Sequence, residues 1–146
     1  MIKLFGMGKA YWEHFEHKAD IGIRGFGNTM AEAFTQAAIA LTAVITDLAL
    51  INATTAIQLS CSDPDNETLL YDWLNTLVYE MATRKLLFSR FQVQIAQQRL
   101  HGKAWGETID VARHQPAVDI KGATFTELRV WQGEDGRWQA QCVIDV

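Results

Sequence analysis

The chain has 146 residues, about the size of one domain, and 49% of them are apolar, which is enough for one hydrophobic core. Its net charge of −4 argues against a protein that grips nucleic acid through bulk positive charge, although a locally basic patch stays compatible with it. The chain has two cysteines and no CxxC motif, which argues against a disulfide framework. It shows neither a signal peptide nor an apolar run of ~18 residues, so we predict a cytoplasmic protein with no membrane partner.

The first part of the chain predicts two strands and a helix. Short strands are expected over residues 11–17 and 21–26, and the glycines of the second strand invite a bend or bulge. Thr29 and Glu32 fit a capping box, in which Thr29 accepts a backbone hydrogen bond and Glu32 reaches back. Apolar residues then recur at helical spacing, so we expect an amphipathic helix that ends near Thr46.

The middle of the chain predicts a further strand and a second helix. Residues 56–61 alternate between apolar and polar, as a half-buried strand does. Asp63 then has the character of a helix N-cap, with Pro64 at the first helical position. The apolar stripe that contains Trp73 predicts a helix running to about Lys85, with Trp73 in the core.

The rest of the chain predicts strands. They are expected over residues 91–97, 100–107, 118–132 and 137–146. The segment from Gly133 to Gly136 predicts a hairpin turn between the last two. Because hairpins join most of the strands, we predict a single-domain α+β fold with a largely antiparallel sheet and two helices packed on one face. A flexible lead-in over residues 1–10 is expected to precede a domain over residues 11–146.

Two carboxylates near strand ends are the candidates for a metal site. Asp20 lies between the first two strands, and Asp145 lies on the more polar face of the last strand. Val146 is the last residue and adds a main-chain carboxylate. Together these groups would form an all-oxygen site, which hard cations such as Ca²⁺ or Mg²⁺ prefer. The same groups are equally compatible with solvated carboxylates at a turn and at a chain end.

Four further polar residues have no clear role in the sequence. Asp72 lies beside the apolar stripe of the second helix, where it could line a cleft or form a salt bridge. Lys121 could contact phosphate or simply occupy a sheet face. Glu107 and His114 give weaker signals still.

No motif for catalysis stands out. The chain contains neither a G-x-S-x-G nucleophile turn nor a P-loop, and the glycines of residues 22–27 have the wrong offsets for binding phosphate. His14 and His17 are three residues apart on an expected strand, so they lie on opposite faces and are poor joint ligands. We therefore predict a protein that is not an enzyme.

Several motifs, in order, resemble those of the archease family. Residues 17–23 resemble the family's His-Thr/Ser-Ala-Asp-Ile/Val-Gly opening, and residues 69–75 resemble its Leu-Leu-Val-Asp-Trp-Leu-Asn segment. Residues 120–125 and the ending, residues 143–146, follow in family order. Thr126 stands where His is common, so no role is carried over to that position.

The resemblance implies the archease fold and an accessory role. Archeases assist RtcB-type RNA ligases, which join a 3′-phosphate or 2′,3′-cyclic phosphate to a 5′-hydroxyl in tRNA splicing and RNA repair. They promote guanylylation of the ligase and multiple turnover, and RNA contact is expected to be indirect or weak. The family's metal site, carried over, consists of Asp20, Asp145 and Val146. Ca²⁺ is the first choice of cation, with Mg²⁺, Mn²⁺ or Zn²⁺ as alternatives.

Two other functions stay open from the residues. A metal-dependent phosphohydrolase would use the same carboxylates, and it would need a general base besides the metal ligands. A general chaperone or interaction module would act on unrelated clients without a metal.

Overall fold

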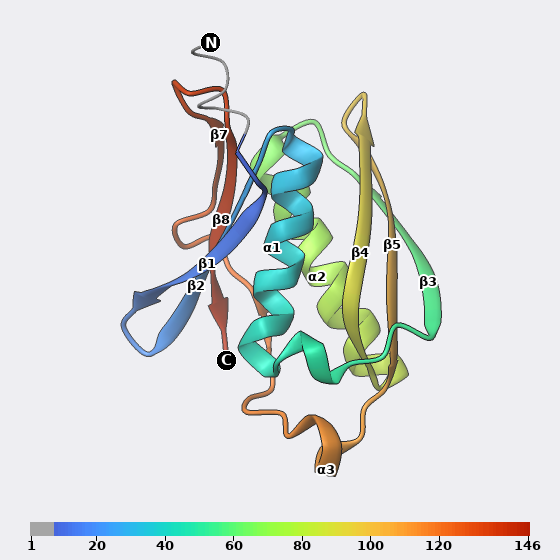
Figure 1. Ribbon diagram of the computed structural model, residues 1–146. Helices are drawn as coiled ribbons and strands as arrows, with labels where there is room; N and C mark the ends of the chain where they lie inside the picture. The colour runs from blue at the N-terminus through green and yellow to red at the C-terminus, as the bar shows by residue number, and fades with distance from the viewer. Residues whose placement is uncertain (1–7) are drawn as a thin grey trace.

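Helix α1 (Met30–Ile45) lies at the centre of the molecule, and its sequence accounts for both of its ends (Figure 1). The Oγ1 of Thr29 accepts a hydrogen bond from the backbone N–H of Glu32 at 3.1 Å. The Glu32 carboxylate in turn accepts from the backbone N–H of Asn28 at 2.9 Å. The helix is capped at its other end by Thr46. The predicted capping box and the predicted helix end are confirmed.

Five strands form one antiparallel sheet, here called the β8 sheet. Its members are β1 (Tyr11–His17), β2 (Asp20–Gly27), β6 (Gly122–Ala123), β7 (Arg129–Gln132) and β8 (Trp138–Asp145). The long strands follow the order β1-β2-β8, and the two short strands β6 and β7 both pair with β8. Strand β8 is therefore the inner strand to which the rest of this sheet is attached.

Three strands form a second antiparallel sheet, here called the β5 sheet. They are β3 (Thr55–Ser62), β4 (Leu86–Ala96) and β5 (Arg99–Thr108), in the order β3-β5-β4. Helix α2 (Asn66–Arg84) connects β3 to β4. Its N-cap is Asp65, which accepts from the backbone N–H of Thr68, so the prediction of Asp63 as the cap is wrong. Asp63 instead accepts from the backbone N–H of Asp65 at 3.0 Å, a turn that precedes the helix.

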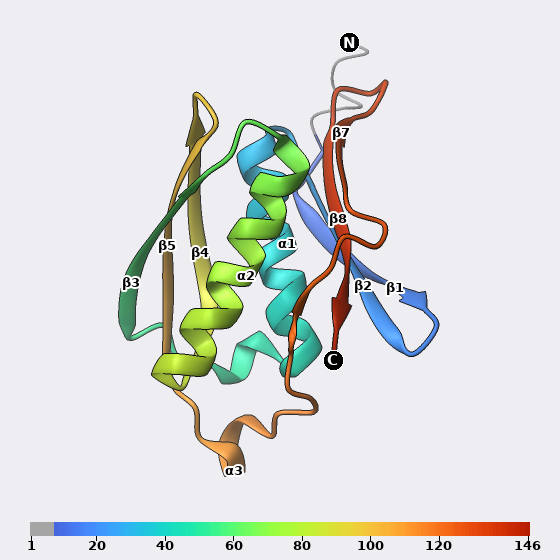
Figure 2. The same cartoon turned by 180° about the vertical axis from the view of Figure 1, so that it is seen from behind.

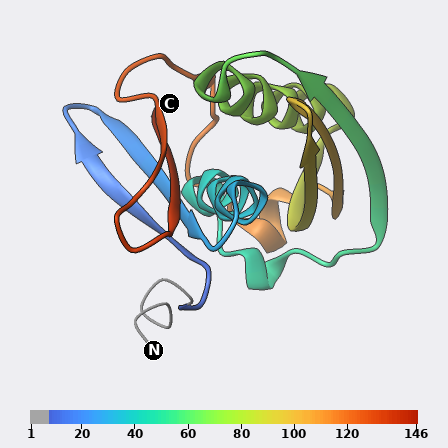
Figure 3. The same ribbon diagram turned by 90° about the horizontal axis from the view of Figure 1, so that it is seen from above.

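The two helices lie between the two sheets (Figures 1 and 3). Figure 2 shows the same arrangement from behind, with α2 in front of α1. The predicted α+β fold with antiparallel pairing is confirmed, but the strands divide into two sheets. The reason lies in α1, where the consecutive residues Ala40, Leu41 and Thr42 are all fully buried. Because consecutive helical residues point about 100° apart, this helix needs cover on more than one side.

Strand β2 does not bend, although its glycines predicted that it would. It keeps an unbroken register with both β1 and β8. A Cβ atom at Gly25 would lie 2.3 Å from the Ala33 carbonyl oxygen and 2.5 Å from the Ala37 backbone nitrogen. Glycine is thus required here because the backbone of α1 packs directly on the strand.

The segment between β5 and β8 differs most from the prediction. The long strand expected over residues 118–132 is wrong, since only β6 and β7 are strands there. Residues 124–128 form a turn between them, with Glu127 at a positive φ of 55°. A short helix, α3 (Val111–His114), and the 3-10 turn η2 (Leu48–Leu50) were not expected.

The computed structural model of the protein describes residues 8–146, so the predicted lead-in over residues 1–10 falls mostly outside the described part of the chain. Within the described part, no helix is both long enough and apolar enough to cross a membrane.

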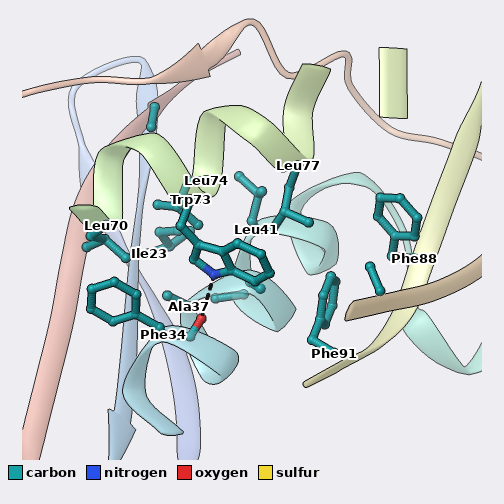
Figure 4. Packing of buried hydrophobic residues seen from close by; sticks show 14 of the residues in the cluster. Ile23, Phe34, Ala37, Leu41, Leu70, Trp73, Leu74, Leu77, Phe88 and Phe91 are labelled. Atoms are coloured by element: carbon teal, nitrogen blue, oxygen red, sulfur yellow. Dashed lines mark hydrogen bonds between the residues drawn. The ribbon is translucent and has the colours of Figure 1, made fainter. Parts of the chain in front are cut away.

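Trp73 of α2 links this helix both to α1 and to the β5 sheet (Figure 4). Its side chain is fully buried, and its Nε1 donates to the Phe34 carbonyl of α1 at 3.1 Å. The same ring lies so close to β5 that a Cβ atom at Gly102 would be 2.6 Å from it. The prediction that Trp73 belongs to the core is confirmed.

We predict that Trp73→Ala lowers the free energy of unfolding by about 3–5 kcal/mol, because it leaves a large cavity and removes the hydrogen bond from the indole to the Phe34 carbonyl. Tyr79→Ala is the matched control, since Tyr79 is an aromatic residue of the same helix that is 64% exposed. It should change stability by less than about 0.5 kcal/mol. Urea unfolding of both variants would test this, and equal effects would contradict it.

Candidate metal centre

Three residues of the candidate motifs lie in one row at the end of the β8 sheet. His17 of β1 is paired with Asp20 of β2. The register of β2 with β8, continued by one residue beyond its last pair, brings Asp20 opposite Asp145. On the other side of β8, Gly122 is paired with Asp145. Segments that are far apart in the sequence therefore meet at this row.

The two carboxylates project from the face of the sheet that is turned away from α1. Opposite residues of an antiparallel pair share a face, and successive residues alternate between faces. Ile144, next to Asp145, is fully buried against the core, so Asp145 points outward. Asp20, Asp145 and Val146 are each partly exposed. The predicted polar face of the last strand is confirmed, and its end is open to solvent.

The motif glycine, Gly22, is explained by a close approach. A Cβ atom at this position would lie 2.2 Å from the ring of Phe15, its partner on β1. The guanidinium of Arg24 stacks on the same ring at 4.6 Å and also pairs with Glu13. Phe15 can therefore lie flat over the strand directly beside Asp20, and it covers the sheet up to the carboxylate row.

On the other side of β8, a segment of α2 holds the short strand β6 in place. The Asn75 side-chain oxygen accepts from the backbone N–H of Ala123 at 2.9 Å. The backbone N–H of Lys121 donates to the carbonyl of Asp145 at 2.8 Å. Lys121 is therefore a neighbour of Asp145, and its exposed position leaves its charge available near the carboxylates. All four motifs that resemble the archease family meet around this end of β8.

His14 and His17 lie on opposite faces of β1, as predicted. His14 donates from Nε2 to the Ala40 carbonyl of α1 at 2.8 Å. It thus anchors β1 to the central helix, whereas His17 shares the outer face with Asp20.

Asp72 lines a shallow pocket of about 350 Å³ on the surface of α2. The pocket is bounded by Cys61, Asp72, Asn75, Thr76 and Tyr79. Burial raises the pKa of Asp72, and the charge of Asp63 adds to the effect. Burial, with Asp72 and Asp63, also raises the pKa of the Cys61 thiol to about 11. This raised pKa keeps the thiol protonated at neutral pH, which disfavours it as a nucleophile.

The donor set of Asp20, Asp145 and Val146 consists of carboxylate oxygens, which fit a hard divalent cation. Across residues 8–146, no group of three or more His, Cys, Asp or Glu side chains is gathered as a cage for a metal ion. The predicted centre has two side chains of these types, and its third predicted group is the main-chain carboxylate of Val146. We call this set the candidate centre below.

The whole domain resembles known proteins. The chain matches the Archease protein family (MTH1598/TM1083) over residues 12–146. It belongs to the archease family. It is 41% identical over 139 residues to the protein archease of Pyrococcus furiosus, which covers 92% of this chain and 98% of that protein. It is 35% identical over 144 residues to the protein archease of Methanosarcina acetivorans, with 95% and 97% covered.

The archease fold is also confirmed by a solved structure. The solution structure of Methanobacterium thermoautotrophicum protein 1598 matches this chain with a TM-score of 0.82 and 32% sequence identity. The match covers 92% of this chain and 98% of that protein. The resemblance inferred from the motifs therefore extends over the whole fold.

Glu107 and His114 of this archease lie in a separate polar network at the end of β5. His114 is fully buried, and its Nδ1 accepts from the backbone N–H of Asp110 at 2.8 Å. Nε2 must therefore carry the proton that is donated to Glu107 at 2.9 Å. Glu107 also accepts from the backbone N–H of Asn52 and from Arg113, each at 2.7 Å.

This network has a structural role. The hydrogen bond from Asn52, followed by those from Arg113 and His114, lowers the pKa of Glu107 to about 2. The charged Glu107 carboxylate connects α3, through Arg113 and His114, and the segment after η2, through Asn52, to the β5 sheet. Glu107 and His114 showed only weak signals in the sequence, because Asn52, which completes the network, lies far from them along the chain.

We predict that Glu107→Gln lowers stability at neutral pH, because a neutral amide lacks the negative charge that strengthens the hydrogen bonds from Asn52, Arg113 and His114. The folded pKa of about 2 lies below the ordinary value of 4.5. The stabilisation is therefore complete above pH 4.5 and is lost as the pH falls towards 2.

Urea unfolding of the wild type and the variant between these pH values measures the effect. Glu134→Gln, in the exposed hairpin turn, is the control and should make no difference at any pH. A gap between the wild type and Glu107→Gln that is independent of pH would count against the assignment.

Proposed function

We propose that this archease is a non-catalytic, metal-binding accessory protein of the cytoplasm that activates an RtcB-type RNA ligase in tRNA splicing and RNA repair. The observation that carries the proposal is the meeting of four separate family motifs around Asp20 and Asp145. Membership of the family over nearly the whole chain supports it. The resemblance supplies the partner and the reaction.

The chemistry of the candidate centre suits a role in phosphoryl transfer on the partner. A divalent cation would neutralise phosphate charge, and such reactions depend mostly on positioning and electrostatics. Asp20, Asp145 and the Val146 carboxylate would hold the cation at an exposed sheet end, where a ligase-bound triphosphate can approach. Lys121, next to Asp145, would contact the phosphates. Ca²⁺ is the cation proposed first, with Mg²⁺, Mn²⁺ and Zn²⁺ as alternatives.

One assay separates this function from its rivals. The purified protein, alone and with an RtcB-type ligase, is tested for nucleotide hydrolysis and for ligase guanylylation, with and without a chelator. An accessory protein stimulates guanylylation in a chelator-sensitive way and hydrolyses nothing alone. A phosphohydrolase turns over nucleotides without the ligase, and a general chaperone acts on unrelated clients whether or not metal is present.

We predict that Asp145→Ala abolishes metal binding and ligase stimulation while the fold survives. Asp145 is partly exposed at the end of a strand, so truncation leaves no core cavity. Glu134→Ala removes an exposed carboxylate in the turn before the start of β8, at the opposite end of the strand from Asp145, and is the matched control. Calorimetric metal titration, ligase turnover and thermal unfolding without metal are measured for both variants. Wild-type turnover in Asp145→Ala would show that the assignment of the centre is wrong.

We also predict that residues added after Val146 weaken metal binding, because they convert an ionised carboxylate into a neutral amide. The same residues added before Met1 should have no effect. The Arg137 guanidinium donates a hydrogen bond to the Lys9 carbonyl, and Arg137 directly precedes the first residue of β8. Asp145 is the last residue of β8, so Lys9 lies at the opposite end of this strand. Metal titration of the two extended proteins tests this. Equal affinities would leave Asp20 and Asp145 as the only ligands supported.

A further inference from the structure

The outer face of the β5 sheet carries positive charge without matching negative charge. Strands β3 and β4 contain no Asp or Glu at all, and β5 contains only Glu107, which Arg113 and His114 engage. The whole protein has 17 Asp and Glu residues and a net charge of −4, so this is a local reversal of its overall charge.

Three cations project from this face. Leu100 and Ala104 of β5 are fully buried against the helices, so the residues between and beside them, Arg99 and Lys103, point outward. Arg90 of β4 is paired directly with Trp105 of β5. These four residues, Arg90, Arg99, Lys103 and Trp105, are called the cationic face below.

An irregularity in β4 builds the centre of this face. The register of β4 with β5 shifts between Phe88 and Arg90, at the position of a β-bulge. Phe88 is fully buried, and the bulge turns Arg90 outward directly opposite Trp105. The Arg90 guanidinium lies 4.6 Å from the centre of the Trp105 ring, and the Lys103 ammonium lies 5.3 Å from it. The ring thus holds both cations in place by cation–π attraction.

The cationic face is open. Figures 1 and 3 show both long helices on the inner side of the β5 sheet, and no element within residues 8–146 covers its outer side. In the same described residues, none of Arg90, Arg99 and Lys103 forms a salt bridge. Their charges are therefore available to an external anion.

We propose that the cationic face binds single-stranded RNA. Such RNA offers a row of phosphates and unstacked bases, and proteins bind it with cationic grooves and stacking platforms. Arg99 and Lys103 would contact phosphates, and a base would stack on the exposed Arg90 guanidinium, which is supported from below by Trp105. A duplex has no free base faces to use this platform. An acidic protein segment would match only the charge.

This inference does not depend on the candidate centre or on the ligase. The test therefore uses the protein alone, in the presence of a chelator, so that its failure leaves the proposed function untouched. Fluorescence anisotropy follows the binding of a labelled oligouridine of about 12 nucleotides. Salt is varied between about 50 and 200 mM, because phosphate contacts make binding depend on salt.

The chain offers a closely matched pair of variants. Arg129 of β7 also stacks on a tryptophan, Trp131, at 4.0 Å, but it belongs to the β8 sheet. Arg90→Gln should weaken RNA binding roughly threefold to tenfold and should reduce the salt slope by about 0.7, whereas Arg129→Gln should change neither. The neighbouring outward residues of β4 are Gln92 and Gln94, so glutamine suits this strand. Thermal unfolding checks that both variants are folded.

Three results would overturn the proposal. One is no binding of oligouridine at the lowest salt. Another is equal weakening by Arg90→Gln and Arg129→Gln, which would indicate diffuse charge rather than this face. The third is competition by polyglutamate or by duplex RNA as effective as that by single-stranded RNA, since an acidic protein or a duplex would then fit the face equally well.

Discussion

The burial of α1 on several sides is the constraint on which the rest of the structure depends. Three consecutive residues of this helix, Ala40, Leu41 and Thr42, are fully buried, and they point in three different directions. Such a helix cannot lie on one sheet with its other side in water. Gly25 allows its backbone to pack directly on β2, and the Trp73 indole, bonded to the Phe34 carbonyl, ties α2 to it. Two sheets on opposite sides of a helix layer follow from this arrangement.

This architecture decides where the polar chemistry can lie. Because the inner faces of both sheets are committed to the helices, carboxylates and cations are left to outer faces and strand ends. Strand β8 has β2 on one side and β6 on the other, so Asp145 has a motif segment on each side. Asn75 connects α2 to this end of β8, because its side-chain oxygen accepts a hydrogen bond from the backbone N–H of Ala123. The candidate centre thus rests on the β8 sheet and on the helix layer.

Local signals in the sequence predicted the elements well where one pattern decided them. Thr29 and Glu32 located the start of α1, and the alternation of β8 placed Ile144 towards the core and Asp145 on the opposite face. The failures come from tertiary contacts, which a single chain pattern does not display. Gly25 is required by the close approach of the α1 backbone, which is distant in sequence. The bulge before Arg90 lets Phe88 point into the core while Arg90 points outward. Asp20 and Asp145 were assigned to one site because of the motif resemblance rather than because of their spacing.

The uneven charge of the molecule suits its two outer faces to partners of different chemistry. A protein with net charge −4 is repelled by a polyanion at long range, except from the direction of a local positive patch. Because β3 and β4 lack carboxylates, RNA would approach the β5 sheet, and the helix layer would keep it away from the β8 sheet. The carboxylates of the candidate centre would then face a different partner. If both proposals hold, such a chain would hold an RNA strand and a ligase at once, because the two surfaces share no strand.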